Sequence, residues 1–307
     1  MKIIVVANKT LSRGNGNIFD ASYYNFYIPL LELGHKVFFW DTTLRYHPKP
    51  FDELVRSFKP DLILCVLAGD ARIAPSEPIC DIYEITQKGN IKTLNWFCDD
   101  TWRFSTFNER YCKMFSYCTT PEKKYIEKYK SIGYDNAILG NWHCNESLNL
   151  GRYSMNAIDV GFCGGLTESR SEVFEYLKSS NINISHYYGI AYEDIFRIYC
   201  SSKIVLNLTV NHNDPEKKRQ MKLRIFEAVC AGALLITEYV DGLEDFFELG
   251  KEIISFETKE EAAEKIKYYL TYENENEREE IAKAGYQRFL KDHTSKIRLT
   301  KLLETIC

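Results

Sequence analysis

The sequence predicts an α/β protein built from two consecutive halves, each with a mainly parallel sheet. Short apolar or β-branched runs alternate with amphipathic stretches, which is typical of β-α-β units. This alternation restarts near Gly151. The chain has 307 residues, and domains usually span about 100–200 residues each. We therefore predict two domains, residues 1–150 and 151–307, joined near residues 145–155.

The first half contains one clear crossover unit. Its predicted strands are Lys2–Ala7, Lys36–Trp40, Asp61–Val66, Lys92–Phe97 and a weaker one near Ala137–Leu139. Between the first two strands, apolar and aromatic residues of the segment Asp20–Leu33 recur at helical spacing. Gly34 follows directly and suits the end of a helix.

The second half repeats the pattern. A buried strand is predicted at Asp159–Cys163, followed by Gly164-Gly165 and a helix over Glu168–Lys178. Further strands are predicted at Asn183–Tyr187, Lys203–Leu208, Ala233–Thr237 and Glu252–Phe256. From Lys259 onward the chain is charged and amphipathic, and its last helix is a candidate to pack back on the N-terminal domain.

Composition and charge exclude several classes of protein. With 45% hydrophobic and 27% charged residues, disordered and fibrous classes are excluded. A net charge of −4 gives no basic field, so no nucleic-acid partner is expected. The ten cysteines form no CxxC pair and several lie in apolar runs, which indicates reduced thiols. With no signal-like start and no run of about 18 apolar residues, we expect a cytoplasmic protein without a transmembrane segment. Peripheral membrane contact stays open.

A glycine-rich segment follows the first strand. Gly14, Asn15 and Gly16 are candidates to bring backbone N–H groups onto a phosphate or a sugar. The segment matches the dinucleotide fingerprint only in part, since Phe19 replaces its third glycine. Asp41, after the second strand, is where such folds place a ribose-binding acid. A nicotinamide or flavin enzyme is therefore one alternative, and a loop without a ligand is another.

The segment 221–237 is the most informative in the chain. It predicts a short helix that begins near Lys222 and Arg224, carries Glu227 one turn further in and ends at Gly232. Cations at a helix N-terminus are unfavourable because they oppose the macrodipole. Their presence here is easier to understand if a dianion binds at the helix start. Glu227 would then accept hydrogen bonds from the two hydroxyls of a ribose. The alternative is a solvated basic helix start with a surface glutamate.

An ordered series of motifs over about residues 158–300 resembles one family. These motifs are Val160-Gly161-Phe162-Cys163-Gly164-Gly165 with Arg170, Ser202–Asn207, Arg224-Ile225-Phe226-Glu227-Ala228 through Glu238, Leu249–Ile253, Arg278–Gly285 and His293-Thr294. Together they resemble glycosyltransferases of the spore maturation CgeB-like group, relatives of the family 4 type GT-B enzymes. The first half matches GT-B N-terminal domains only generically, through Gly34-His35-Lys36-Val37.

The resemblance implies a GT-B fold, in which two Rossmann-like domains with parallel sheets face each other across a cleft. The N-terminal domain would bind the acceptor and the C-terminal domain the nucleotide-sugar. Glu227 would bind the donor ribose, while Lys222, Arg224 and backbone amides such as that of Leu223 would hold the diphosphate. The donor loop would include Gly164, Gly165 and Arg170. Family 4 enzymes often have a pair of glutamates eight positions apart. Glu227 corresponds to the later one, but the earlier position is Arg219, which departs from the family.

The implied reaction transfers a sugar to an unidentified small-molecule, glycan or protein acceptor. Fixed cations at the leaving diphosphate can replace a metal ion, so we predict no metal site and no required cofactor. UDP- or GDP-linked donors are expected ahead of others. Asp99 and Asp100 follow an apolar run and are the candidates for a general base or a hydroxyl-orienting group. An N-cap role there is the alternative. A protein that binds nucleotide-sugars without catalysis is the competing class.

Overall fold

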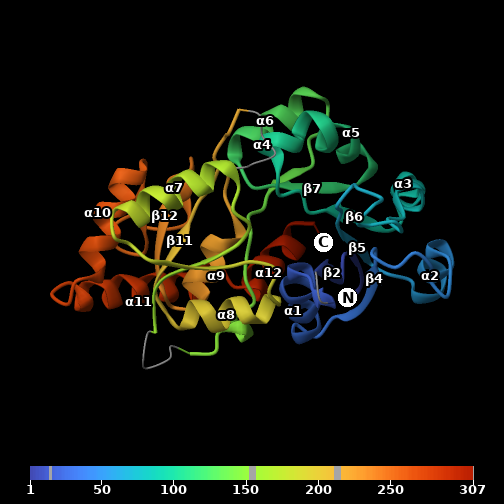
Figure 1. Cartoon of the computed structure of the whole chain (residues 1–307). Helices are drawn as coiled ribbons and strands as arrows, with labels where there is room; N and C mark the ends of the chain where they lie inside the picture. Colours follow the sequence, from blue (N-terminus) through green and yellow to red (C-terminus); the bar gives the residue numbers. More distant parts are fainter. Residues whose placement is uncertain (14–15, 152–156, 211–215, 307) are drawn as a thin grey trace. The chain divides into compact units, whose positions relative to one another are not determined.

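The computed structural model describes residues 1–13, 16–151, 157–210 and 216–306 (Figure 1). The chain forms two compact units. The first unit contains Met1–Trp142 together with Arg298–Cys307, and the second unit contains His143–Ile297. Each unit is described by itself below.

The first unit is built on a six-stranded parallel sheet with the order β4-β1-β5-β6-β7-β8. Its strands are β1 (Lys2–Ala7), β4 (Lys36–Asp41), β5 (Leu62–Val66), β6 (Lys92–Asn95), β7 (Tyr117–Thr120) and β8 (Ala137–Leu139). The structure confirms five predicted strands within one or two residues at each end. Strand β7 was not predicted from the sequence.

Helices cover both faces of this sheet. They are η1 (Tyr23–Tyr27), α1 (Ile28–Glu32), α2 (Phe51–Phe58), α3 (Ile79–Lys88), α4 (Asp100–Arg103), η2 (Phe104–Asn108), α5 (Glu109–Tyr111), η3 (Cys112–Met114), α6 (Lys123–Ser131) and the part of α12 (Ser295–Ile306) from Arg298 onward. Alternate residues of a strand point to opposite faces. Ile4 and Val6 of β1 therefore pack toward α2, α3 and α6, whereas Ile3 and Val5 pack toward η1, α1 and α12.

The glycine-rich segment is part of a β-hairpin, which corrects the predicted loop. Strand β2 (Thr10–Arg13) pairs antiparallel with β3 (Gly16–Phe19), and Arg13 lies opposite Gly16. The dipeptide Gly-Asn between two short β-branched or apolar runs is a sequence signal for a hairpin as well as for a glycine-rich phosphate loop. Gly14 and Asn15 themselves lie outside the described residues.

The second unit is built on a five-stranded parallel sheet with the order β10-β9-β11-β12-β13. Its strands are β9 (Ile158–Cys163), β10 (Ile184–Tyr187), β11 (Ser202–Asn207), β12 (Leu234–Glu238) and β13 (Ile254–Phe256). Its helices are η4 (Glu146–Leu148), α7 (Glu168–Ser179), α8 (Tyr192–Cys200), α9 (Leu223–Cys230), η5 (Leu243–Asp245), α10 (Lys259–Leu270), α11 (Glu275–Asp292) and the first residues of α12. The predicted strands are confirmed.

One apolar cluster of the second unit packs on one face of its sheet. Val160 and Phe162 of β9 belong to an apolar cluster that also includes Leu177 of α7 and Ile266 of α10. Within the second unit, Figure 1 places α7 and α10 along the sheet strands β11 and β12. The charged tail from Lys259 onward is three helices, and the last of them continues into the first unit.

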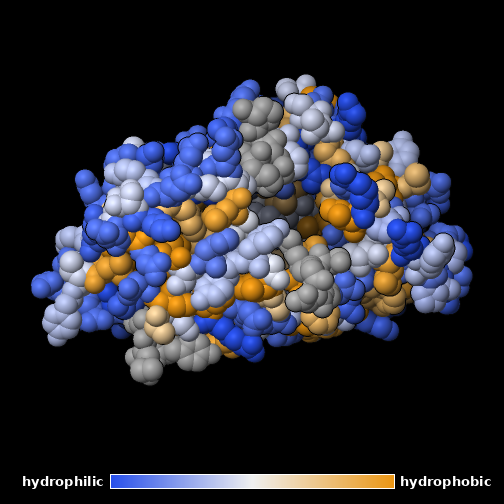
Figure 2. All heavy atoms as spheres, viewed as in Figure 1, coloured by the Kyte–Doolittle hydropathy of each residue, from blue (hydrophilic) through white to orange (hydrophobic). Residues whose placement is uncertain are grey.

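No helix in the described parts of the chain is long and apolar enough to cross a bilayer. On the face shown in Figure 2, hydrophilic side chains predominate and hydrophobic ones form limited areas between them.

Candidate functional site

Arg224, on the first turn of α9, connects two strand ends of the second sheet. Its Nε and Nη2 donate to the carbonyl oxygen of Cys163 at 2.9 and 2.7 Å, and its Nη1 donates to Asn207 Oδ1 at 2.9 Å. The guanidinium lies over the ring of Phe162, 4.4 Å from the ring centroid. Cys163 ends β9 and Asn207 ends β11, so Arg224 holds together the carboxyl ends of neighbouring strands. Ligand sites of parallel α/β sheets lie at this edge.

Arg170 brings a second guanidinium to the same aromatic ring. It comes from the first turn of α7, its Nη1 donates to the Gly165 carbonyl at 2.8 Å, and it lies 5.8 Å from the Phe162 ring centroid. Burial, together with the nearby positive charge of Arg224, lowers the pKa of Arg170 from 12.5 to about 10. Its buried Nε has no hydrogen-bond partner within the described part of the chain. Positive charge is therefore concentrated at the end of β9, and one buried donor there has no partner among the described residues.

Gly164 allows the Arg224 guanidinium to approach the end of β9. Its φ is +152°, and a Cβ at this position would lie 2.3 Å from Arg224 Nη2. The neighbouring strand fixes its backbone, because Gly164 N donates to Tyr187 O at 2.8 Å and its carbonyl lies 2.7 Å from His186 Nε2. The structure thus brings together Gly164, Gly165, Arg170 and Arg224, four residues that the sequence assigned to one loop and one helix.

The start of α9 suits an anion. Lys222 occupies the N-cap position and Leu223 is the first helical residue. The first turn of α9 contains no acidic residue, so its positive dipole end is not compensated from within the helix. The amide of Ile225 donates to the Lys222 carbonyl at 3.2 Å, and the amide of Leu223 lies at the very start of the helix, where backbone N–H groups are left without a partner in the helical pattern.

Glu227 lies one turn further along α9 and is buried, with 6% of its surface exposed. Burial raises the pKa of this carboxyl, while the charge of Arg224 and a hydrogen bond with Tyr192 of α8 oppose that shift. The sequence alternative of a solvated surface glutamate is therefore wrong, because the carboxyl belongs to the interior of the second unit.

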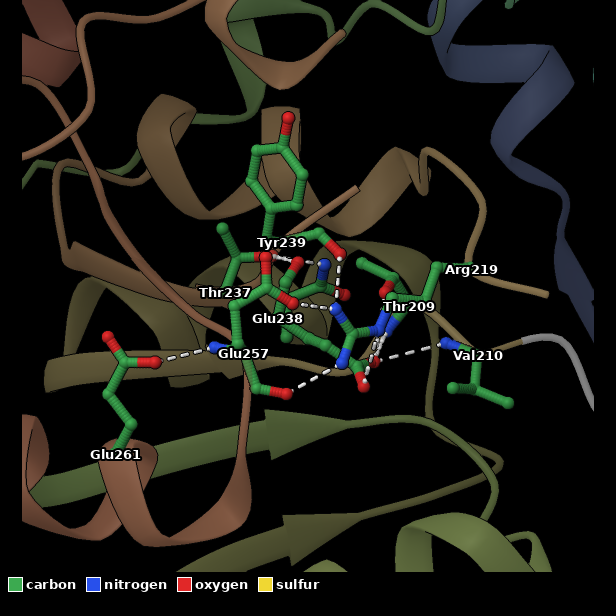
Figure 3. A network of polar contacts seen from close by, with 9 residues as sticks. Thr209, Val210, Arg219, Thr237, Glu238, Tyr239, Glu257 and Glu261 are labelled. Atoms are coloured by element: carbon green, nitrogen blue, oxygen red, sulfur yellow. Dashed lines mark hydrogen bonds and ion pairs between the residues drawn. The ribbon is translucent and has the colours of Figure 1, made fainter. Parts of the chain in front are cut away.

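Arg219 forms ion pairs with the carboxylates of Glu238 and Glu257 (Figure 3). Its Nε lies 3.2 Å from Glu238 Oε1, its Nη1 bonds the Glu257 carboxylate, and its Nη2 donates to the Glu257 carbonyl at 2.6 Å. The other carboxylate oxygen of Glu238 accepts from the backbone and hydroxyl of Thr209 at 2.8 and 2.9 Å. The positive charge at position 219 is thus paired within the second unit, where Arg219 joins the ends of β12 and β13 and Glu238 joins them to the residues after β11.

The two adjacent aspartates of the first unit have different surroundings. Asp99 is the half-buried N-cap residue of α4, at the carboxyl end of β6, while Asp100 is fully buried. Asp100 Oδ1 accepts from Asn108 Nδ2 and from the Tyr129 hydroxyl, both at 2.8 Å. Burial raises the pKa of Asp100 to about 6 despite these hydrogen bonds. The two side chains therefore do not form one site.

Asp41 organises loops of its own unit. Its Oδ1 accepts from Lys9 N at 3.1 Å and from the backbone and hydroxyl of Thr43 at 3.0 and 2.6 Å. These bonds use one of the two carboxylate oxygens to hold the residues before β2 and after β4 together. Across the described residues, no group of three or more His, Cys, Asp and Glu side chains is arranged to hold a metal ion.

Sequence reasoning missed two parts of the Arg224 arrangement. The Cys163 carbonyl is a backbone group, and Asn207 ends a strand that was predicted only for its apolar residues. A polar residue after an apolar run in a parallel sheet was the available signal for Asn207.

Comparisons with known proteins identify the family and the fold. A family model described as glycosyl transferase-like matches residues 136–304, more than half of the chain. No curated protein matches the sequence. The fold is similar to a glycosyltransferase from Rickettsia africae ESF-5 (TM-score 0.64, 12% identity, 99% of this chain and 97% of that chain). It is also similar to sucrose-phosphate synthase from Thermosynechococcus elongatus (TM-score 0.65, 10% identity, 99% and 98%).

A third similar structure is Anabaena Alr3699/HepE in complex with UDP and glucose (TM-score 0.66, 12% identity, 99% of each chain). At these identities the likeness concerns the fold, which is the GT-B fold with two parallel α/β sheets. Membership of the narrower CgeB-like group stays a prediction. The family match and the fold together show that this chain belongs to the glycosyl transferase-like family.

Proposed function

We propose that this protein transfers a sugar from a nucleotide-sugar to an acceptor and that the second unit binds the donor. The observation that carries the proposal is the pair Arg170 and Arg224, gathered over Phe162 at the end of β9. Two cations beside glycine backbone and an uncompensated helix start form an environment suited to a diphosphate. The buried Glu227 on the same helix supplies a carboxylate for the ribose hydroxyls.

The two arginines have different proposed roles. Arg224 uses Nε, Nη1 and Nη2 to hold Cys163 and Asn207, so we assign it the positioning of the strand ends. Arg170 donates to Gly165 through Nη1 and its buried Nε has no partner among the described residues, so we assign it the charge that attracts the diphosphate. Backbone amides at the start of α9, from Leu223 onward, with Lys222 at its N-cap, complete the proposed anion site.

The reaction chemistry follows from these charges. When the bond between the anomeric carbon and the diphosphate breaks, negative charge grows on the leaving group. Fixed cations and amides stabilise that charge in the transition state. We therefore propose a reaction that does not depend on a metal ion, which turnover unchanged by EDTA would support and turnover lost to EDTA would refute.

On the acceptor side, we propose Asp99 as the group that orients or deprotonates the attacking hydroxyl. It is half-buried at the carboxyl end of β6, where ligand sites of parallel sheets lie. Asp100 is not proposed for this role, because it is fully buried and bonded to Asn108 and Tyr129. Asp99→Asn should abolish transfer and leave donor binding unchanged.

The test of donor binding is calorimetric titration with UDP, the nucleotide present in the similar HepE structure. Glu227→Gln should weaken UDP binding about tenfold or more, the effect of losing hydrogen bonds to a charged group. Glu175→Gln, on the exposed surface of α7, is the matched control and should bind UDP like the unmodified protein. Equal affinity of Glu227→Gln and the unmodified protein would refute the ribose role.

Catalysis needs a separate measurement, since binding alone would also fit a non-catalytic protein. Slow release of UDP from UDP-glucose without an acceptor is expected if the site promotes bond cleavage. If UDP-glucose binds but no UDP is released with or without a panel of acceptors, the protein binds nucleotide-sugars without transferring them.

A further inference from the structure

A pocket of about 510 Å³ lies within the first unit, at the carboxyl ends of its strands. Three segments line it: the β2–β3 hairpin, the residues after β4 and the residues after β5. The lining residues are Thr10, Leu11, Asn17, Thr43, Leu44, Arg45, Arg72, Ile73 and Pro75. Pockets of this size accommodate small organic ligands. None of these residues belongs to the proposed donor site.

Hydrogen bonds fix all three walls of the pocket. Asp41 joins the first two, because it accepts from Lys9 N, directly before β2, and from both donors of Thr43. Glu77 fixes the third wall by accepting from the backbone of Ala68 at 2.6 Å and of Gly69 at 3.1 Å. A pocket held in this way loses little conformational entropy when a ligand binds.

The charge of the lining is one-sided. Among the described residues that line it are two arginines and no acidic residue. Arg72 is partly neutralised, since its Nε and Nη2 donate to Asp70 at 3.0 and 2.7 Å. Arg45 is exposed and makes no ion pair or hydrogen bond with any described residue. The pocket therefore presents one uncompensated cation.

The same pocket exposes apolar side chains. Leu44 is 47% exposed and Ile73 is 54% exposed, and Leu11 and Pro75 add to the apolar lining. Large exposed apolar side chains gathered in one concave place mark a binding surface. A ligand that suits this lining carries an apolar portion next to an anionic group.

We propose that this pocket binds the acceptor and that the acceptor is an amphipathic anion. Its carboxylate or phosphate would lie next to Arg45, with Arg72 nearby, and its apolar portion against Leu44 and Ile73. The assignment as acceptor site rests on the proposed transferase function, while the ligand chemistry rests on the pocket alone.

The test is calorimetric titration of the full chain with three probes. Octyl phosphate carries both features, octyl β-glucoside has the same alkyl chain with a neutral head group, and inorganic phosphate has only the anion. Octyl phosphate should bind at least about tenfold more tightly than either of the other two, because charge-assisted hydrogen bonds and apolar burial add to its affinity.

Matched variants locate the binding. Arg45→Gln should weaken octyl phosphate binding about five- to tenfold, in the range of a charge-assisted hydrogen bond. Arg56→Gln, on α2 and paired with Asp52 at the surface, is the control and should bind like the unmodified protein. Vesicles of phosphatidylcholine with and without phosphatidylglycerol distinguish the source of the anion. If the protein is retained on the anionic vesicles and Arg45→Gln is not, the anion is a lipid head group. If the protein is not retained, the anion belongs to a soluble acceptor.

Three results would overturn the proposal: octyl phosphate affinity unchanged in Arg45→Gln, octyl β-glucoside binding as tightly as octyl phosphate, or no binding of any probe. UDP titration of the same samples separates this outcome from failure of the proposed function. Binding of octyl phosphate without binding of UDP would support the proposed pocket ligand and refute the proposed transferase function. Binding of UDP without binding of octyl phosphate would support the transferase function and refute the pocket ligand.

Discussion

Replacing Asp100 with asparagine should stabilise the first unit relative to the unmodified protein, and this difference in stability should grow as the pH rises. In the folded protein this carboxyl is fully buried, and its Oδ1 accepts from Asn108 and Tyr129. An asparagine can keep an oxygen in the same place to accept both bonds. It removes the charge that the aspartate acquires at neutral pH and replaces the buried Oδ2 with an NH2 group, whose effect on stability does not depend on pH.

The size of the effect follows from the pKa. Burial raises the pKa of Asp100 from 3.8 to about 6, so the folded state holds the proton more tightly than the unfolded state. The stability contribution of this group is therefore complete below pH 3.8 and is lost as the pH rises through 6. The complete loss is about 3 kcal/mol, and about half of it falls between pH 5 and pH 8.

Tryptophan fluorescence during urea unfolding measures this contribution selectively. All four tryptophans, Trp40, Trp96, Trp102 and Trp142, belong to the first unit. The stability of Asp100→Asn minus that of the unmodified protein should increase by about 1.4 kcal/mol from pH 5 to pH 8. Asp135→Asn, which removes an exposed carboxyl from the same unit, corrects for the change in net charge. A difference that stays constant with pH would refute the reasoning.

Three further predictions concern packing and the donor site. Gly285→Ala should destabilise the second unit by about 1–3 kcal/mol, because its Cβ would lie 2.3 Å from the Glu252 carbonyl oxygen, and circular dichroism during unfolding measures this. Arg224→Met should lower the stability of the second unit and weaken UDP binding together, whereas Arg170→Met should weaken UDP binding at nearly unchanged stability. Deleting Arg298–Cys307 should lower the urea midpoint of tryptophan fluorescence, because four apolar side chains of this segment belong to the core of the first unit. An unchanged midpoint would contradict that packing.

The strands that the sequence predicted share one property. Segments such as Lys2–Ala7 and Ile158–Cys163 are apolar or β-branched over most of their length, because parallel strands are covered on both faces. Strand β7 has the sequence Tyr-Cys-Thr-Thr, and its two threonines are fully buried. Local hydrophobicity does not distinguish such a strand from a loop. Its neighbours β6 and β8 are what make it a strand.

The sequence names the residues of the candidate site but not their contacts. Arg224 and Glu227 stand three positions apart on one helix, a relation that a sequence shows directly. The partners of Arg224 are 61 and 17 residues away along the chain, and they meet it only because β9 and β11 are neighbours in the sheet. Strand order is a tertiary property, and the spacing of residues along the chain does not contain it.

The structure also changes the argument for an anion at α9. From the sequence, cations at a helix start were difficult to explain without a bound dianion. Arg224 needs no such ligand, since two strand-end oxygens already accept its hydrogen bonds. The less compensated cation is instead Arg170: burial and Arg224 lower its pKa, Glu238 only partly opposes that shift, and its Nε has no partner within the described chain. A buried cation held beside another cation is costly unless an anion offsets the repulsion. The case for a diphosphate therefore rests on Arg170, and Arg224 contributes by holding the strand ends that Arg170 faces.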